Sequence, residues 1–159
     1  MNPRILLVDD HEIVREGIRT LLQRARPEWI ICGEASNAGD AHKAVRGLDP
    51  DIMILDITMP GTSGLELAKQ LKTMNVRTRI LIFTMHDFRR LAMDVRDVGA
   101  QGYVLKSQAG RDLIVAIERV LAGGTFFGPS NESQARGGSE SSKSGTTESG
   151  TVLRVKLAF

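Results

Sequence analysis

The sequence predicts an α/β fold in which short buried strands alternate with amphipathic helices. Five short apolar runs recur along residues 1–127, and each is followed by a longer segment with apolar residues at helical spacing. The runs are continuously apolar rather than alternating, which is typical of strands that are buried on both faces. This repeated order of strand and helix favours a single parallel sheet with helices on both of its faces.

The first two strand–helix units occupy residues 5–48. Residues 5–8 form the first apolar run, and apolar residues at 13, 14, 18, 21 and 22 follow it at helical spacing, with Pro27 as a stop signal. Residues 29–35 are the second expected strand. Asn37 is placed to cap the next helix, which carries apolar residues from 41 to 48 on one side.

The other three units follow in the same order. The expected strands are residues 51–55, 79–83 and 102–105, and the expected helices are residues 63–74, residues 87–98 and the segment with apolar residues from 113 to 121. After Gly123 and Gly124 this alternation stops. Residues 128–159 are rich in Ser, Gly and Thr and have no apolar period before residues 152–159, so we expect a disordered tail without a helix-turn-helix.

Composition and charge indicate an ordinary globular protein. The 159 residues suffice for one domain with a core, and 42% of them are hydrophobic and 25% charged. The net charge of +2 gives no reason to expect binding to nucleic acid or to a membrane surface. The single cysteine, Cys32, is expected to be a small buried residue, with a reactive or intermolecular thiol as the alternative. The N-terminus offers neither a signal peptide nor a membrane span, so a cytoplasmic location is expected.

Polar side chains follow four of the five expected strands. Asp9 and Asp10 follow the first strand, Asp56 the third, Thr84 the fourth and Lys106 the fifth. The carboxyl ends of parallel strands lie along one edge of a sheet, where such folds place their binding sites. Each residue alone has an ordinary explanation, because Asp often caps helices and Thr and Lys are common at strand ends. Their shared position at strand ends favours one functional site.

Three neighbouring carboxylates need a positive partner. Their charges repel one another and raise each other's pKa unless a cation lies between them. Mg²⁺ suits this role because it prefers oxygen ligands, and Lys106 provides a second positive charge suited to a phosphoryl oxygen. No His or Cys is placed as a base beside a serine. The residue types therefore favour phosphoryl transfer to a carboxylate, which depends mainly on positioning and charge neutralisation.

Four motifs resemble the signature of the receiver domains of bacterial two-component response regulators. They are Val-Asp-Asp-His at residues 8–11, Asp-Ile-Thr-Met-Pro-Gly at 56–61, Thr-Met-His at 84–86 and Tyr-Val-Leu-Lys at 103–106. Their details are similar to the NarL/FixJ, or LuxR-type, branch. The resemblance implies a receiver domain over residues 1–127, with a flavodoxin-like, doubly wound five-stranded sheet in the order 2-1-3-4-5.

The resemblance implies a role for each acidic residue. Asp56 would be the phosphoacceptor, which attacks the phosphorus of a phosphohistidine in a sensor histidine kinase. Asp10 and Asp56 would bind Mg²⁺ directly together with the backbone carbonyl of Thr58, and Asp9 would hold a metal-bound water. His11 is expected to begin the first helix rather than to bind the metal, since Mg²⁺ prefers oxygen ligands.

The resemblance also implies a conformational switch. Lys106 would pair with the phosphoryl group, Thr84 would move to hydrogen-bond it, and Tyr103 would turn inward in response. The alternative for Tyr103 is an ordinary half-buried strand residue with its hydroxyl in water. By the same resemblance, Thr58 and His86 occupy variable positions from which side chains would alter the access of water to the aspartyl phosphate.

The expected partners follow from the same resemblance. A sensor histidine kinase would be the donor, and the chain would act as a phosphoacceptor rather than an enzyme, apart from its own phosphorylation by small donors and its own dephosphorylation. Homodimers would form through the fourth helix, fifth strand and fifth helix, or through the first and fifth helices. DNA binding is not expected, and a truncated DNA-binding regulator is the alternative. A magnesium-dependent phosphatase is disfavoured because Ile57 and Thr58 supply no second acid beside Asp56.

Overall fold

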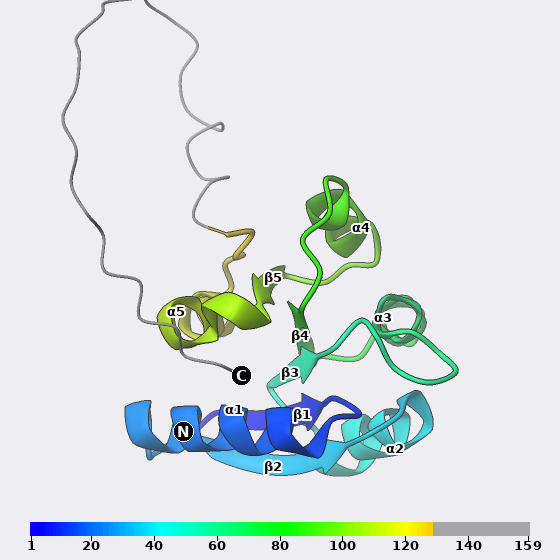
Figure 1. Ribbon diagram of the computed structural model, residues 1–159. Helices are drawn as coiled ribbons and strands as arrows, with labels where there is room; N and C mark the ends of the chain where they lie inside the picture. Colours follow the sequence, from blue (N-terminus) through cyan, green and yellow to red (C-terminus); the bar gives the residue numbers. More distant parts are fainter. Residues whose placement is uncertain (129–159) are drawn as a thin grey trace, which may run out of the picture.

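A five-stranded parallel sheet forms the centre of the computed structural model, which describes residues 1–128 (Figure 1). The strands are β1 (Arg4–Val8), β2 (Ile30–Ala35), β3 (Ile52–Leu55), β4 (Arg79–Thr84) and β5 (Gly102–Leu105). They lie in the order β2-β1-β3-β4-β5, and every neighbouring pair is parallel. The predicted fold class and strand order are both confirmed.

Two layers of helices cover the two faces of the sheet. The helices are α1 (Glu12–Ala25), α2 (Ala38–Leu48), α3 (Gly64–Thr73), α4 (Leu91–Asp97) and α5 (Ala109–Leu121), with a short 3-10 helix, η1 (Lys106–Gln108), before α5. Buried residues of α1 and α5 pack on one face to form the α1/α5 core, and those of α2, α3 and α4 form the α2/α3/α4 core on the other. Strand residues alternate between the faces, so that Leu7 joins the first core while Leu6 and Val8 join the second.

The strand register brings two aspartates together at the carboxyl edge of the sheet. Val8 lies opposite Leu55 in the pairing of β1 with β3. The Asp56 N–H extends this pairing by donating to the Val8 carbonyl over 2.9 Å. The residue that follows each strand is therefore an aspartate, Asp9 or Asp56, and the two lie at the same edge.

The helices lie within the expected segments, and one of them begins later than expected. Asn37 and Ser63 cap α2 and α3, and each side chain accepts a hydrogen bond from the backbone N–H three residues later. The helix predicted over residues 87–98 begins only at Leu91. The residue before it, Arg90, makes no side-chain capping bond, and the apolar spacing that buries the helix starts at Leu91 itself. The prediction was therefore too long by one turn at its start.

The chain that follows α5 returns to the free edge of β5. Phe126 forms a parallel bridge with Gly102. The Phe126 N–H donates to the Gln101 carbonyl over 3.0 Å, and its carbonyl accepts from the Tyr103 N–H over 2.9 Å. The side chain of Phe126 enters the α1/α5 core, whereas that of Phe127 enters the α2/α3/α4 core. This return was not predicted, because a single bridge is too short to leave a strand pattern in the sequence.

Two remaining expectations concern Cys32 and the ends of the chain. Cys32 is half-buried, its thiol donates to the Ile5 carbonyl over 3.4 Å, and burial raises the pKa of that thiol, which lowers its reactivity. The expectations for the tail fall on residues 129–159, outside the described part of the chain. None of the helices within residues 1–128 has the length and apolar character needed to cross a membrane.

The close approach of Gly64 to Asp56 gives a test of this packing. A Cβ at Gly64 would lie 2.8 Å from the Asp56 carbonyl carbon and 2.9 Å from the Ile57 Cα, distances that real side chains do not adopt. We expect Gly64→Ala to lower the free energy of unfolding by about 1–3 kcal/mol through overpacking. The measurement is urea denaturation followed by circular dichroism.

The control is the same substitution in α2. Nothing lies within 4 Å of a Cβ built at Gly47, so Gly47→Ala should raise the free energy of unfolding by about 0.5–1 kcal/mol through helix propensity. If both variants changed stability in the same direction, the close approach at Gly64 would not be the cause.

Candidate functional site

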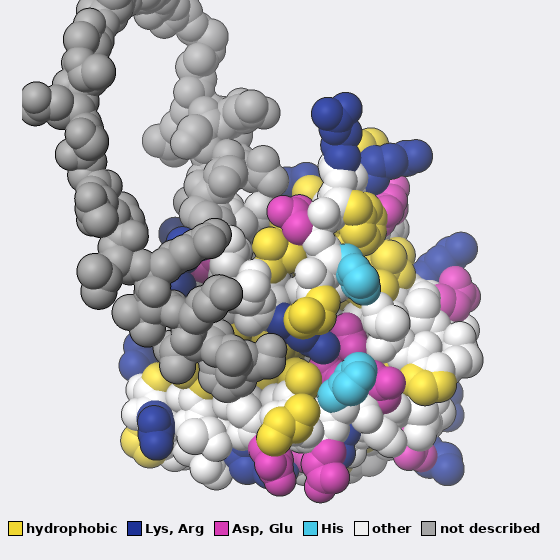
Figure 2. Space-filling view, viewed as in Figure 1, with side chains coloured by type: hydrophobic (Ala, Val, Ile, Leu, Met, Phe, Trp, Pro, Cys, Tyr) yellow, Lys and Arg dark blue, Asp and Glu magenta, His cyan; other side chains and the backbone are white. Residues whose placement is uncertain are grey.

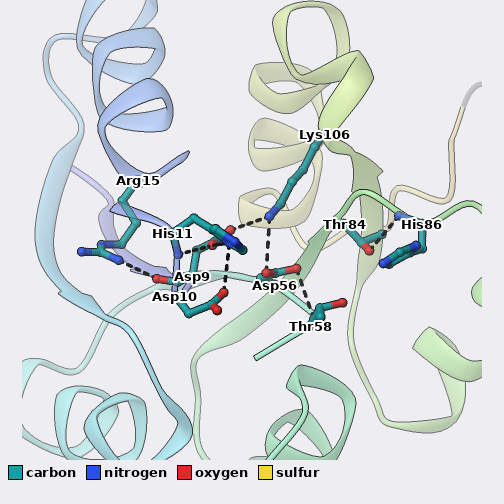
Figure 3. A network of polar contacts seen from close by, with 9 residues as sticks. All are labelled: Asp9, Asp10, His11, Arg15, Asp56, Thr58, Thr84, His86 and Lys106. Carbon is teal, nitrogen blue, oxygen red and sulfur yellow. Dashed lines mark hydrogen bonds and ion pairs between the residues drawn. The ribbon is translucent and has the colours of Figure 1, made fainter. Parts of the chain in front are cut away.

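The carboxyl edge of the sheet gathers the polar residues that the sequence singles out (Figure 3). Asp9 and Asp10 follow β1, Asp56 follows β3, Thr84 is the last residue of β4 and Lys106 is the first residue of η1. On the face seen in Figure 2, acidic and basic side chains meet between two histidine side chains. The structure thus brings the acids and the lysine together from segments far apart in the sequence.

Lys106 lies between two buried carboxylates. Its Nζ is 2.7 Å from Asp9 Oδ2 and 3.3 Å from Asp56 Oδ2. The side chains of Asp9 and Asp56 are only 2% and 3% exposed. Charges in such surroundings interact strongly because little water screens them. The ammonium therefore holds both carboxylates in place at the edge of the sheet.

The charge of the site is unbalanced, and Asp56 shows the effect. Burial, the largest cause, and the negative charge of Asp9 raise the pKa of Asp56 above its ordinary value of 3.8. Lys106 and the Thr58 N–H, which lies 3.3 Å from Asp56 Oδ1, oppose this rise without cancelling it. Asp10 adds a third carboxylate at the same edge. One ammonium thus faces three carboxylates, so a further cation would stabilise the ionised site.

The three carboxylates are arranged so that they could bind that cation. One oxygen each from Asp9, Asp10 and Asp56 and a ring nitrogen of His11 lie within 4.8 Å of one another. Asp10 Oδ1 is buried and accepts no hydrogen bond within residues 1–128, although His11 Nδ1 lies 3.1 Å away. A buried carboxylate oxygen in this state is stabilised when a metal ion supplies positive charge. The acidic cluster is therefore compatible with a divalent metal site.

His11 lies over the acidic cluster in a way that the sequence did not predict. As expected, it begins the first helix, since it is the N-cap residue of α1. Its ring turns back toward the acids, with Nδ1 3.2 Å from Asp9 Oδ1 and 3.1 Å from Asp10 Oδ1. Its backbone N–H also donates to Asp9 Oδ1 over 2.8 Å. The His11 side chain is 60% exposed, so its ring lies between the acidic cluster and the solvent.

Arg15 contacts the site through the backbone of Asp9, which the sequence did not predict. Its guanidinium donates to the backbone carbonyl of Asp9 over 2.6 Å and to Glu34 Oε2 over 3.0 Å. Arg19 from the next turn of α1 also pairs with Glu34. These contacts join α1 to the ends of β1 and β2 and fix the backbone from which Asp9 projects. In the sequence Arg15 has only the ordinary spacing of a polar residue on an amphipathic helix.

The other predicted residues lie around the acids without contacting them through their side chains in the described structure. Thr84 is fully buried, and its Oγ1 accepts a hydrogen bond from the His86 N–H over 3.2 Å. The side chains of Thr58 and His86 are exposed, and Thr58 meets Asp56 through its backbone N–H. Tyr103 is half-buried in β5, and no hydrogen bond joins it to Thr84.

Comparison with known proteins identifies this arrangement. The family model for the response regulator receiver domain matches residues 5–118 of this chain. The nitrate/nitrite response regulator NarL of Escherichia coli is 36% identical over 119 residues, which are 75% of this chain and 55% of that protein. The response regulator UvrY of Escherichia coli is 37% identical over 123 residues, which are 77% of this chain and 56% of that protein. The chain therefore spans little more than half of the length of these relatives.

Solved structures agree with the sequence comparison. A LuxR-family two-component response regulator from an Aurantimonas species superposes with a TM-score of 0.76 at 43% identity, covering 81% of this chain and 91% of that one. The isolated receiver domain of RcsB from Salmonella enterica serovar Typhimurium, solved with the phosphomimetic BeF₃⁻, superposes with a TM-score of 0.74 at 29% identity, covering 81% and 95%. On its fold, its acidic cluster and these matches, the chain belongs to the response regulator receiver domains of two-component systems, with relatives of the NarL and LuxR type.

Proposed function

We propose that this receiver accepts a phosphoryl group on Asp56 from the phosphohistidine of a sensor histidine kinase, with Mg²⁺ held by the acidic cluster. The observation that carries the proposal is the buried Asp56 carboxylate, which lies 3.3 Å from the Lys106 ammonium and beside two further carboxylates. Response regulators work with sensor histidine kinases, so membership of the family supplies the class of donor.

Asp56 would act as the nucleophile through one carboxylate oxygen. That oxygen forms a bond to phosphorus while the bond from phosphorus to the imidazole nitrogen breaks, and the imidazole leaves with the electron pair of that bond. Mg²⁺, when bound, supplies positive charge where carboxylate and phosphoryl oxygens come together. Asp10, Asp56 and the Thr58 carbonyl would hold the metal, and Asp9 would hold a water molecule bound to it.

Lys106 and Thr84 would complete the site around the phosphoryl group. The Lys106 ammonium already faces Asp56, so it can pair with a phosphoryl oxygen by a small movement. The Thr84 hydroxyl would bind the phosphoryl group after breaking the hydrogen bond that it now accepts from the His86 N–H. Tyr103 would follow, and the surface formed by α4, β5 and α5 would change. The site residues would thus act together in a single phosphorylation step.

The output that we propose is a change in protein contacts. All five α-helices within residues 1–128 pack on the sheet, so none of them is free to act as a DNA recognition helix. A related solved structure is described as two RcsB dimers bound to two parallel DNAs. For this chain we propose homodimers through α4, β5 and α5, or through α1 and α5, as the contact that phosphorylation controls.

Phosphoryl uptake tests the central role of Asp56. The protein is incubated with acetyl phosphate and Mg²⁺, and its intact mass is measured. We expect wild type to gain the mass of one phosphoryl group and Asp56→Asn to gain none, because an amide is a poor nucleophile. Asp49→Asn changes an acid at the amino edge of the sheet and should be labelled like wild type. Labelling of Asp56→Asn to the wild-type extent would rule out Asp56 as the acceptor.

Metal affinity tests the acidic cluster separately from phosphorylation. Asp10→Asn removes a charged oxygen ligand, so we expect the affinity for Mg²⁺ to fall by at least about tenfold in isothermal titration calorimetry. Asp49→Asn again serves as the matched control and should leave the affinity unchanged. An Asp10→Asn isotherm that superposes on that of wild type would exclude Asp10 as a ligand.

The raised pKa of Asp56 predicts an effect on stability. Because the folded-state pKa lies above 3.8, the ionised carboxylate destabilises the metal-free fold, and this penalty grows as the pH rises through the folded-state pKa. We therefore expect Asp56→Asn to raise the free energy of unfolding at neutral pH without metal. The gain should shrink toward pH 4 and be reversed by saturating Mg²⁺. Urea denaturation between pH 4 and 8 measures it, and a gain that is independent of pH would contradict the electrostatic cause.

A further inference from the structure

The ring of Tyr103 lies against a small aromatic and cationic stack at the edge of the sheet. The rings of Tyr103 and Phe127 meet edge to face, with centroids 6.2 Å apart and an interplanar angle of 70°. The guanidinium of Arg96 in α4 lies over the Phe127 ring, 3.8 Å from its centroid. Both contacts have geometries that are attractive in proteins. Phe127 is thus enclosed between the fourth helix and the fifth strand.

The backbone around Phe127 is fixed independently of its side chain. Phe126 bridges Gly102 and forms hydrogen bonds with the residues on either side of that glycine, Gln101 and Tyr103. Gly102 allows this close approach, since a Cβ there would lie 2.7 Å from the Phe126 carbonyl carbon. The segment that follows α5, drawn in yellow and orange in Figure 1, is therefore attached to β5 next to Tyr103. The backbone next to Phe127 is therefore held in place independently of the Tyr103 side chain.

The pKa of Tyr103 reflects its burial and its charged neighbours. Burial, the largest cause, and the negative charge of Asp87 raise the pKa of Tyr103, whereas Arg96 opposes that rise. Arg96 therefore acts on both rings of the stack. Among the described residues, no hydrogen bond of the Tyr103 hydroxyl holds the side chain in this position. Packing against the α2/α3/α4 core, to which the Phe127 ring belongs, is accordingly what holds it.

We propose that Phe127, held by Arg96, is a positioning residue that keeps Tyr103 in the position seen here and so opposes the activated state of the receiver. The inference rests on the proposed function, because it requires Tyr103 to move when the acceptor site is occupied. Loss of an aromatic pair of this kind changes an equilibrium by about two- to tenfold. Removing the ring should therefore favour the activated state by that factor, and ligands of the acceptor site should bind more tightly to the same extent.

The single tyrosine of the chain allows a direct test. The 159-residue chain is labelled with 3-fluorotyrosine, and the ¹⁹F signal of Tyr103 is followed while beryllium fluoride, a phosphoryl mimic, is titrated at saturating Mg²⁺. Each variant is compared with its own starting spectrum, so that the lost ring current of Phe127 does not enter the result. We expect the midpoint for Phe127→Ala to lie about two- to tenfold below that of wild type.

Phe126→Ala is the matched control. It removes a ring that is buried to nearly the same extent, 7% exposed against 8%, but from the α1/α5 core and away from the Tyr103 ring. We expect it to lower the free energy of unfolding while leaving the midpoint of the titration unchanged. Phe127→Leu keeps apolar volume without the aromatic contacts, so it should fold well and lower the midpoint like Phe127→Ala.

The possible outcomes separate this inference from the proposed function. A wild-type ¹⁹F signal that does not respond to beryllium fluoride would refute the switch, and the role of Phe127 with it. A wild-type response with unchanged midpoints in both Phe127 variants would refute only the positioning role. An equal decrease of the titration midpoint in Phe126→Ala would also refute the positioning role, because general loss of packing would then explain the effect.

Discussion

The contact of the Lys106 ammonium with Asp9 and Asp56 is the interaction on which the rest of the site depends. Burial of a charge costs free energy unless a partner of opposite sign lies close by, and here one ammonium serves two carboxylates that are almost withdrawn from water. Asp10 leaves the balance negative. A further cation bound beside these carboxylates would therefore stabilise the site. That is the property which a metal-dependent phosphoacceptor needs, since binding then relieves a repulsion that already exists in the fold.

The parallel sheet concentrates these charges as a consequence of its geometry. β1 and β3 pair in a register that sets Val8 opposite Leu55, so the next residues, Asp9 and Asp56, meet whatever their charge. The backbone cannot easily move apart to reduce the repulsion, because Gly64 at the start of α3 packs directly on the Asp56 peptide. The free energy that opposes the repulsion comes from the two hydrophobic cores on either face of the sheet. Stability of the cores is thus linked to the charge state of the site.

The sequence predicts the sheet, the helices and the types of residue in the site because these depend on local patterns. Apolar runs, a cap such as Asn37 and an aspartate after a strand are all visible within a short window. The unpredicted contacts depend instead on how the elements pack against one another in three dimensions. Arg15 reaches the Asp9 carbonyl because α1 packs back beside the end of β1, and Phe126 pairs with Gly102 only after α5 has crossed the sheet. The ring of His11 is also directed by its surroundings, since the helix-start pattern places only its backbone.

The position of β5 explains why a change at the acceptor site would be expressed at this side of the molecule. β1 and β3 are paired along both sides, whereas β5 is paired along its length with β4 only and carries a single bridge on its other side. Displacement of β5 therefore breaks fewer hydrogen bonds than displacement of a central strand. Tyr103 lies opposite Ile82, two residues before Thr84, so the two proposed switch residues occupy neighbouring strands. A movement of Thr84 toward the site would displace β5 through that pairing. The contacts of Tyr103 with Phe127 and of Phe127 with Arg96 would then change.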